Sequence, residues 1–330
     1  MVYSAAQDRY DKMPVRRSGH SGLQLPILSL GLWRGFGSLA DYDNSRKTVL
    51  TAFDHGIFHF DLANNYGPKP GTAEETFGKI MDQDLRPYRD ELIVTTKAGF
   101  DMWPGPYGHF DSKKTLVSSL DQSLKRMHLD YVDIFYSHRP DPNTKFEETA
   151  DALAGIVQSG KALYIGISNY DTKESAQMGK LLNERHVPFV LNQFSYNMLN
   201  QEAETTGLLD EMERLDAGLI AYGPLAEGLL SDRYLNGIPD TFPVHRTNKF
   251  LFDKGSDKLV EKLNQLNQIA ENRGQTLAQM SLAWLLKSAI VTSVILGTSH
   301  ANHLLDNLKV LDNLELSNDE LVAIDGIING

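Results

Sequence analysis

Short apolar runs alternate with segments of helical periodicity along almost the whole chain. The runs are rich in β-branched residues, and they are nearly continuous rather than alternating in polarity. Continuous runs of this kind are typical of parallel strands that are covered on both faces. A segment of helical character follows each run. The expected strands are Ile27–Leu30, Phe58–Asp61, Leu92–Thr96, Val132–Ser137, Leu163–Ser168, Phe189–Asn192, Leu219–Tyr222 and Ser293–Leu296.

Eight successive strand–helix units predict an α/β fold, the (β/α)8 TIM barrel. Before the first strand, Val15–Arg17 and Leu23–Gln24 flank a turn at residues 18–22, which predicts an N-terminal β-hairpin that closes the barrel floor. We expect a single domain over residues 1–330, with the hairpin at about 14–25 and the barrel at about 26–330. The alternative is an open doubly wound sheet. Residues 31–37 read GLWRGFG, however, and lack the G-x-G-x-x-G spacing of a dinucleotide-binding turn.

Helix ends are marked by capping residues. A Ser or Thr followed three positions later by Glu or Gln predicts a capping box, and a glycine after a helical pattern predicts a left-handed end. The segment 155–161, GIVQSGK, matches a phosphate-binding loop, but Ala162 replaces the hydroxyl residue that would hold magnesium, so we interpret Gly160 as a helix end. The expected boxes are Thr72/Glu75, Thr276/Gln279 and Ser317/Glu320, and the expected end glycines are Gly56, Gly160 and Gly274.

Composition narrows the class of protein. The chain of 330 residues contains no cysteine, which excludes disulfides, thiolate zinc sites and a cysteine nucleophile, and which fits a cytoplasmic location. The net charge of −11 argues against nucleic-acid binding, because phosphate backbones need clustered Lys and Arg. The N-terminal segment has no apolar core typical of a signal peptide, and no stretch approaches the length of a membrane helix. We therefore expect no nucleic-acid and no membrane partner.

Polar residues stand at the carboxyl ends of the expected strands, where barrels build their sites. The second strand ends in Asp61 and is followed by Tyr66, the third is followed by Lys97, and the fourth by His138. A phenol has an ordinary pKa of about 10, and a nearby ammonium lowers it. A carboxylate keeps the ammonium charged and in place, and an imidazole orients a carbonyl. The four residues therefore predict a tuned general acid for a carbonyl oxygen.

Other interpretations of these residues are weaker. Each residue taken alone is more often structural, as an ion pair, a packed ring or a hydrogen-bonded histidine. Lys97 could form a Schiff base as in an aldolase, but Asp61 would keep it protonated. His109, His138, His300 and His303 lack the spacing of metal ligands, so no metal is expected.

Several motifs resemble the aldo-keto reductases, and they span nearly the whole chain in the order of that family. The resemblance is strongest to the branch that contains the bacterial L-glyceraldehyde 3-phosphate reductases and the potassium-channel β subunits, and the segment AGFDMWPGPYG at 98–108 favours the reductases. The motifs are FDLANNYG at 60–67, TTKAG at 95–99, YVDIFYSHRPD at 131–141, GKALYIGISNY at 160–170, NQFSYN at 192–197, YGPLAEGLL at 222–230 and GTSHANHLLDN at 297–307.

The resemblance implies the tetrad Asp61, Tyr66, Lys97 and His138 and an NADP cofactor extended across the barrel mouth. Trp33 would border the nicotinamide and Tyr222 would stack on it. The carboxamide would be bound by Ser168, Asn169 and Gln193, the pyrophosphate by the backbone of Gly223, Pro224, Leu225, Ala226, Gly228 and Leu229, and the adenosine end by Gly297, Thr298, Ser299, His303, Asp306 and Asn307.

Three positions depart from the family pattern near the expected 2′-phosphate. His303 stands where the family usually has Gln or Arg, Asp306 where it has Glu, and His300 where the similar bacterial reductases carry Arg. These changes remove permanent positive charge, which Arg233 and Arg246 could restore. The preference for NADP over NAD is therefore the open part of the cofactor prediction.

The implied activity is the NADPH-dependent reduction of small aldehydes, of the glyceraldehyde 3-phosphate or methylglyoxal type. Trp33, Tyr66, Trp103, His138 and Arg139 are the expected substrate residues, with Phe36 and Met102 beside them. Arg139 could pair with a substrate phosphate, or with Asp141 or another carboxylate. The alternative is an NADPH-binding redox sensor with weak turnover, as in the channel subunits. Those subunits have Asn where this chain has His138, which favours catalysis here. A homo-oligomeric state is left open.

Overall fold

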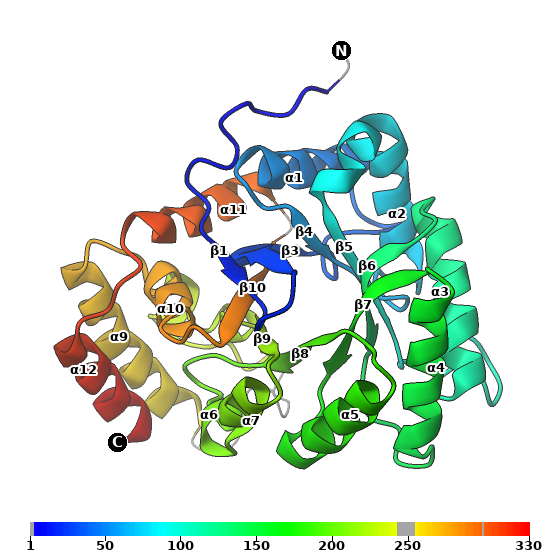
Figure 1. The fold of residues 1–330 in the computed structure, drawn as a ribbon. Helices are drawn as coiled ribbons and strands as arrows, with labels where there is room; N and C mark the ends of the chain where they lie inside the picture. Colours follow the sequence, from blue (N-terminus) through cyan, green and yellow to red (C-terminus); the bar gives the residue numbers. More distant parts are fainter. Residues whose placement is uncertain (1–2, 243–254, 299) are drawn as a thin grey trace.

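The barrel is built from eight parallel strands. A computed structural model describes residues 3–242, 255–298 and 300–330. In it the strands close in the order β10-β3-β4-β5-β6-β7-β8-β9, each hydrogen-bonded to its neighbours (Figure 1). The predicted TIM barrel and its strands are confirmed, with boundaries shifted by at most a few residues. The strands are β3 (Leu28–Gly31), β4 (His59–Asp61), β5 (Ile93–Ala98), β6 (Val132–Ser137), β7 (Ala162–Ser168), β8 (Phe189–Ser195), β9 (Gly218–Tyr222) and β10 (Val291–Gly297).

Helices surround the strands, as Figure 1 shows, because each strand is apolar on the face that points outward and needs a covering layer. The α-helices are α1 (Tyr42–Asp54), α2 (Thr72–Ile80), α3 (Lys113–Met127), α4 (Phe146–Gln158), α5 (Thr172–Glu184), α6 (Glu202–Thr205), α7 (Leu208–Arg214), α9 (Ser256–Asn272), α10 (Leu277–Leu285), α11 (Ala301–Leu308) and α12 (Asn318–Asn329). Shorter turns of helix are η1 (Met81–Leu85), η2 (Arg86–Glu91), η3 (Ala226–Gly228), η4 (Asp232–Tyr234) and η6 (Lys309–Asp312).

The N-terminal hairpin closes the barrel floor, as predicted. β1 (Val15–Arg17) pairs antiparallel with β2 (Gln24–Pro26). Leu23 and Leu25 of the hairpin join the apolar cluster inside the barrel. The Ser18 hydroxyl donates to the carbonyl of Val190 and accepts from the N–H of Gly218 at 3.0 Å, at the amino ends of β8 and β9. With the floor sealed by apolar side chains, the open mouth lies at the carboxyl ends.

Most of the expected helix ends are confirmed. Thr276 with Gln279 and Ser317 with Glu320 form capping boxes. Gly56, Gly160 and Gly274 adopt positive φ, and α4 ends just before Gly160, which rules out a phosphate loop there.

The capping box predicted at Thr72 is wrong, and one box was missed. The N-cap of α2 is Gly71 with φ of 89°, and the Thr72 hydroxyl donates to the carbonyl of Lys69 at 2.7 Å instead. The tight turn before α2 starts the helix one residue earlier than the local pattern indicates. Asp171 and Glu174 form a reciprocal capping box on α5.

Gly166 on β7 leaves room for the ring of Tyr136 inside the barrel. A Cβ at position 166 would lie 2.2 Å from Cε1 of Tyr136. We expect Gly166→Ala to lower the free energy of unfolding by ~1–3 kcal/mol or more, because the buried ring must shift in a packed interior. Gly155→Ala is the matched control. A Cβ at this helical position meets nothing within 4 Å, so it should be neutral or stabilising by up to ~1 kcal/mol. Urea unfolding of both variants tests this, and equal stabilities would contradict it.

No helix within residues 3–242, 255–298 and 300–330 combines the length and the apolar character that crossing a bilayer requires.

Candidate active site

Three of the four predicted catalytic groups are hydrogen-bonded to one another at the mouth. Lys97, near the end of β5, is fully buried. Its ammonium donates to Oδ2 of Asp61 at 2.6 Å, to the carbonyl of Leu62 at 2.7 Å and to the hydroxyl of Tyr66 at 3.3 Å. Asp61 ends β4, and Tyr66 lies in the loop that follows it. The adjacent parallel strands β4 and β5 therefore bring a carboxylate, an ammonium and a phenol into one chain of hydrogen bonds.

The second oxygen of Asp61 is held from β5 and from one further strand, β8. Oδ1 accepts from the hydroxyl of Thr95 and from Nε2 of Gln193, both at 2.9 Å. Gln193 was expected among the cofactor residues, whereas Thr95 was not among the predicted site residues. Strand alternation could have found it, because Thr95 stands two residues before Lys97 and faces the same side of β5.

His59 extends this polar chain toward the barrel interior. It stands two residues before Asp61 on β4, and its Nε2 lies 3.4 Å from the hydroxyl of Thr95. Its Nδ1 lies 2.7 Å from the hydroxyl of Ser29, which in turn lies 2.6 Å from that of Ser293. Burial lowers the pKa of His59 to about 4, so the imidazole is neutral at physiological pH. These hydrogen bonds fix the orientation of Thr95 and Asp61 beneath the mouth.

The surroundings raise the pKa of Tyr66 well above its ordinary value. Burial is the largest cause, and the charge of Asp61 adds to it. The expectation of a lowered pKa for Tyr66 is therefore wrong, because the loss of water around the hydroxyl raises it. Burial likewise lowers the pKa of Lys97, and the Asp61 carboxylate opposes that shift. Tyr66 thus keeps its proton until an acceptor of sufficient basicity lies beside it.

His138 follows β6 directly and lies against Tyr66. The centroids of the two rings are 6.0 Å apart, and Phe100 contacts the imidazole edge-to-face at 4.6 Å. Burial, helped by the charges of Lys97 and Arg139, lowers the pKa of His138 well below its ordinary value. Its buried Nδ1 has no hydrogen-bond partner among the described residues. The imidazole is therefore neutral and has hydrogen-bonding capacity to spare.

The residues expected at the nicotinamide end form one network with the tetrad. Nδ2 of Asn169 donates to the carbonyl of His138 at 2.9 Å, and Oδ1 of Asn169 accepts from the hydroxyl of Tyr222 at 2.7 Å. The hydroxyl of Ser168 donates to the carbonyl of Gln193 at 2.9 Å. Asn169 adopts a left-handed φ of 61°, which turns its amide across the mouth.

The loop expected at the pyrophosphate has an unusual backbone. Gly223 and the consecutive residues 226–228 adopt positive φ. Ala226, Gly228 and Leu229 donate their N–H groups to carbonyls inside the loop, while Pro224 and Leu225 complete the turn. Arg233 follows in η4 and is exposed. The loop holds its left-handed form through its own hydrogen bonds.

The residues expected at the adenosine end surround the start of α11. The Thr298 hydroxyl donates to the carbonyl of His300, and the rings of His300 and His303 lie edge-to-face at 5.8 Å. Nδ1 of His300 lies 3.0 Å from Oδ1 of Asn44 on α1. Asp306 is exposed and paired with Lys309 at 2.7 Å. Gly297 ends β10 and Asn307 lies on α11, whereas Ser299 and Arg246 lie outside the described residues.

The expected substrate residues occupy two segments beside the tetrad. Trp33 is 53% exposed, and its ring centroid lies 6.2 Å from that of Tyr66. Met102 and Trp103 line an open pocket, together with Asp101 and His109, in the segment between β5 and α3. Phe36, by contrast, is 2% exposed and lies in the hydrophobic core.

Arg139 contacts the same segment, and its carboxylate neighbour is Asp101 rather than Asp141. Its Nε donates to the carbonyl of Gly99 at 2.9 Å, and its Nη2 lies 3.9 Å from Oδ1 of Asp101. Oδ2 of Asp141 instead accepts from the hydroxyl of Thr144 at 2.6 Å. The segment between β5 and α3 therefore supplies the neighbours of Arg139.

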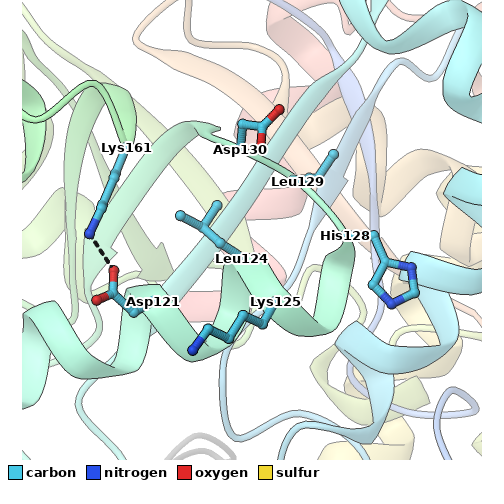
Figure 2. Close-up of a pocket in the computed structure, with 7 residues that line it drawn as sticks. All are labelled: Asp121, Leu124, Lys125, His128, Leu129, Asp130 and Lys161. Carbon is cyan, nitrogen blue, oxygen red and sulfur yellow. Dashed lines mark hydrogen bonds and ion pairs between the residues drawn. The ribbon is translucent and has the colours of Figure 1, made fainter.

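A second pocket, drawn in Figure 2, lies at the amino ends of β6 and β7, away from the mouth. It is lined by the carboxyl-terminal part of α3, by the turn before β6 and by Lys161 before β7. Lys161 is paired with Asp121 at 2.6 Å, as the dashed line in Figure 2 marks. None of the predicted site residues lines this pocket. Among the described residues, no group of three or more acidic or histidine side chains is placed to hold a metal.

Comparison with known proteins matches this barrel to one family. The aldo/keto reductase family model covers residues 27–329. The chain is 53% identical over 329 residues to the L-glyceraldehyde 3-phosphate reductase of Escherichia coli strain K12, covering 98% of this chain and 95% of that protein. It is 33% identical over 314 residues to a probable voltage-gated potassium channel subunit beta of Oryza sativa subsp. japonica, covering 94% of each. The chain is therefore an oxidoreductase that belongs to the aldo/keto reductase family.

Proposed function

We propose that the protein reduces small aldehydes, with phosphorylated glyceraldehyde as the leading substrate, using NADPH and Tyr66 as the proton donor. The observation that carries the proposal is the buried ammonium of Lys97, which joins the Asp61 carboxylate to the Tyr66 hydroxyl at the barrel mouth. A buried ammonium lowers stability unless a carboxylate is paired with it. The Lys97–Asp61 pair would meet that need without a phenol, so the hydrogen bond to Tyr66 favours a catalytic role.

The residues divide the work of reduction. Tyr66 holds a proton at its hydroxyl and gives it to the carbonyl oxygen as negative charge develops there. Lys97 stabilises the phenolate that remains, and Asp61 keeps Lys97 in place. The neutral His138 orients the carbonyl beside Tyr66, and the aldehyde becomes a primary alcohol.

The mouth fits a nicotinamide cofactor. Asn169 and Gln193 place amide groups beside His138 and Asp61, where a carboxamide would be bound, and the ring of Tyr222 lies next to them. When bound, NADPH would supply the hydride. The left-handed loop at 223–229 would hold the pyrophosphate, and Thr298, His303 and the start of α11 the adenosine end. The preference for the 2′-phosphate rests on His300 and His303, which carry charge only when protonated, and on Arg233.

The proposed substrate class follows from Arg139 and from the relatives. Arg139 is 28% exposed beside His138, and a guanidinium binds phosphate oxygens through charged hydrogen bonds. The relatives at 53% identity are named L-glyceraldehyde 3-phosphate reductases. Methylglyoxal is the uncharged substrate that we expect to be reduced less well.

Steady-state oxidation of NADPH and of NADH with a panel of aldehydes tests the proposal. We expect turnover with both glyceraldehyde 3-phosphate enantiomers and with methylglyoxal, highest for the L enantiomer and faster with NADPH than with NADH. Rates near background for every aldehyde, together with tight NADPH binding, would instead favour a redox sensor. A preference for NADH would overturn the assignment of NADP as the cofactor, but it would leave the proposed reductase activity intact.

A further inference from the structure

The guanidinium of Arg139 is held between two aromatic rings. Its Cζ lies 4.3 Å from the ring centroid of Phe100 and 4.2 Å from that of Phe110. Its Nε donates to the carbonyl of Gly99 at 2.9 Å, while Asp101, which is largely exposed, approaches Nη2 only to 3.9 Å. The two rings and the hydrogen bond to Gly99 therefore restrict the guanidinium to one orientation.

Phe100 and Phe110 together form a clamp around the Arg139 guanidinium. The position of the Phe110 ring depends on a strained backbone. Phe110 has a φ of +59°, a conformation that non-glycine residues seldom adopt and that costs of order 1–3 kcal/mol. Its N–H donates to the carbonyl of Gly99 at 2.9 Å, the same oxygen that accepts from Nε of Arg139. Such a conformation persists only where the surrounding structure holds it.

The residue that holds it is Asp111, which follows Phe110 and is completely buried. Its Oδ2 accepts from the hydroxyl of Ser137 and from that of Tyr170, the latter at 3.2 Å, and the two hydroxyls are 2.7 Å apart. The hydroxyl of Thr149 on α4 donates to the carbonyl of Asp111 at 3.3 Å. Asp111 thus ties the end of the segment to β6, to the loop between β7 and α5, and to α4.

Burying this carboxylate is unfavourable, and the fold retains it. Burial raises the pKa of Asp111 to about 7, although the hydroxyls of Ser137 and Tyr170 oppose the shift. Its Oδ1 is buried without a hydrogen-bond partner among the described residues and lies 3.2 Å from the point where a Cβ of Gly99 would be. A buried carboxylate oxygen without a hydrogen-bond partner destabilises the folded protein. The presence of Asp111 is therefore better explained by a functional role than by a contribution to stability.

We propose that Asp111 is a positioning residue that holds Phe110 against Arg139, and that the resulting clamp selects aldehydes that carry a phosphate. This inference rests on the proposed reductase function. A guanidinium fixed before binding loses little conformational entropy when it meets a phosphate, so the clamp increases the affinity for phosphorylated substrates. It contributes nothing to the binding of an uncharged aldehyde.

The test compares KM and kcat for L-glyceraldehyde 3-phosphate with those for methylglyoxal. Arg139→Met should raise KM for the phosphorylated substrate at least thirtyfold, and Asp111→Ala about tenfold, each with kcat within threefold of wild type. For methylglyoxal, KM should change less than twofold in both variants. Asp151→Asn, on the exposed face of α4, is the matched carboxylate control and should change neither substrate's KM.

The double variant Asp111→Ala/Arg139→Met distinguishes positioning from general damage. If Asp111 acts through Arg139, the double variant loses no more than Arg139→Met alone. Additive losses, or equal losses for both substrates, would overturn the proposal. Should Asp111→Ala fail to fold, Tyr170→Phe removes one hydroxyl of the anchor and should still raise KM for the phosphorylated aldehyde about threefold.

Two failures can be told apart in these data. A wild-type protein that reduces neither substrate refutes the proposed function. A wild-type protein that reduces both, with equal KM values that no variant shifts selectively, refutes only the clamp.

Discussion

Replacing Tyr66 by Phe is expected to lower the rate of aldehyde reduction at least a hundredfold, within the range of roughly 10²–10⁴ that general acids contribute. The ring stays, so its contact with His138 at 6.0 Å between centroids stays as well. Lys97 loses only its 3.3 Å bond and keeps Asp61 and the carbonyl of Leu62. Stability should therefore change by no more than about 1 kcal/mol, and the affinity for NADPH should change little.

Tyr136→Phe is the matched control for this variant. The Tyr136 hydroxyl is buried inside the barrel and has no hydrogen-bond partner among the described residues. Removing it should leave the rate within twofold and the stability equal or higher. Single-turnover reduction with both variants provides the comparison. If Tyr66→Phe stays within threefold of wild type, Tyr66 is not the acid.

Replacing Lys97 by Met is expected to abolish most turnover and also to destabilise the fold. The change leaves the Asp61 carboxylate buried beside Thr95 and Gln193 without its counter-charge. Removing one partner of a buried pair costs about 3–5 kcal/mol, because an uncompensated charge remains. Urea unfolding measures this loss, and a loss below about 1 kcal/mol would contradict it.

The double variant Asp61→Asn/Lys97→Met separates the two effects. It leaves no unpaired charge, so part of the lost stability should return while turnover stays absent. Borohydride reduction of wild type with an aldehyde tests the Schiff-base alternative. We expect no adduct, and a substrate-dependent covalent adduct at Lys97 would refute the proton-transfer mechanism.

The tetrad could be predicted from the sequence because a barrel brings the carboxyl ends of all its strands together at one mouth. Asp61, Lys97 and His138 stand at the ends of adjacent strands, so their proximity follows from the order of the strands. The orientation of Tyr66 toward Lys97 follows from its loop and needed the structure.

The clamp around Arg139 could not have been predicted in the same way. Phe100, Phe110 and Asp111 lie in a segment without periodicity. Their contacts are with Arg139, which follows β6, and with Tyr170, which precedes α5. Nothing in the local sequence marks the left-handed backbone of Phe110, since the residue is not a glycine.

The sequence by itself determined the eight strands, the hairpin and the strand-end position of the proposed catalytic groups, because apolar continuity and alternation are local properties of the chain. The tertiary structure decided the electrostatics. Proximity to Lys97 alone predicts a lowered pKa for Tyr66, yet burial raises it. Desolvation depends on every atom that replaces water around a group, and those atoms come from strands and loops that only the closed barrel brings together.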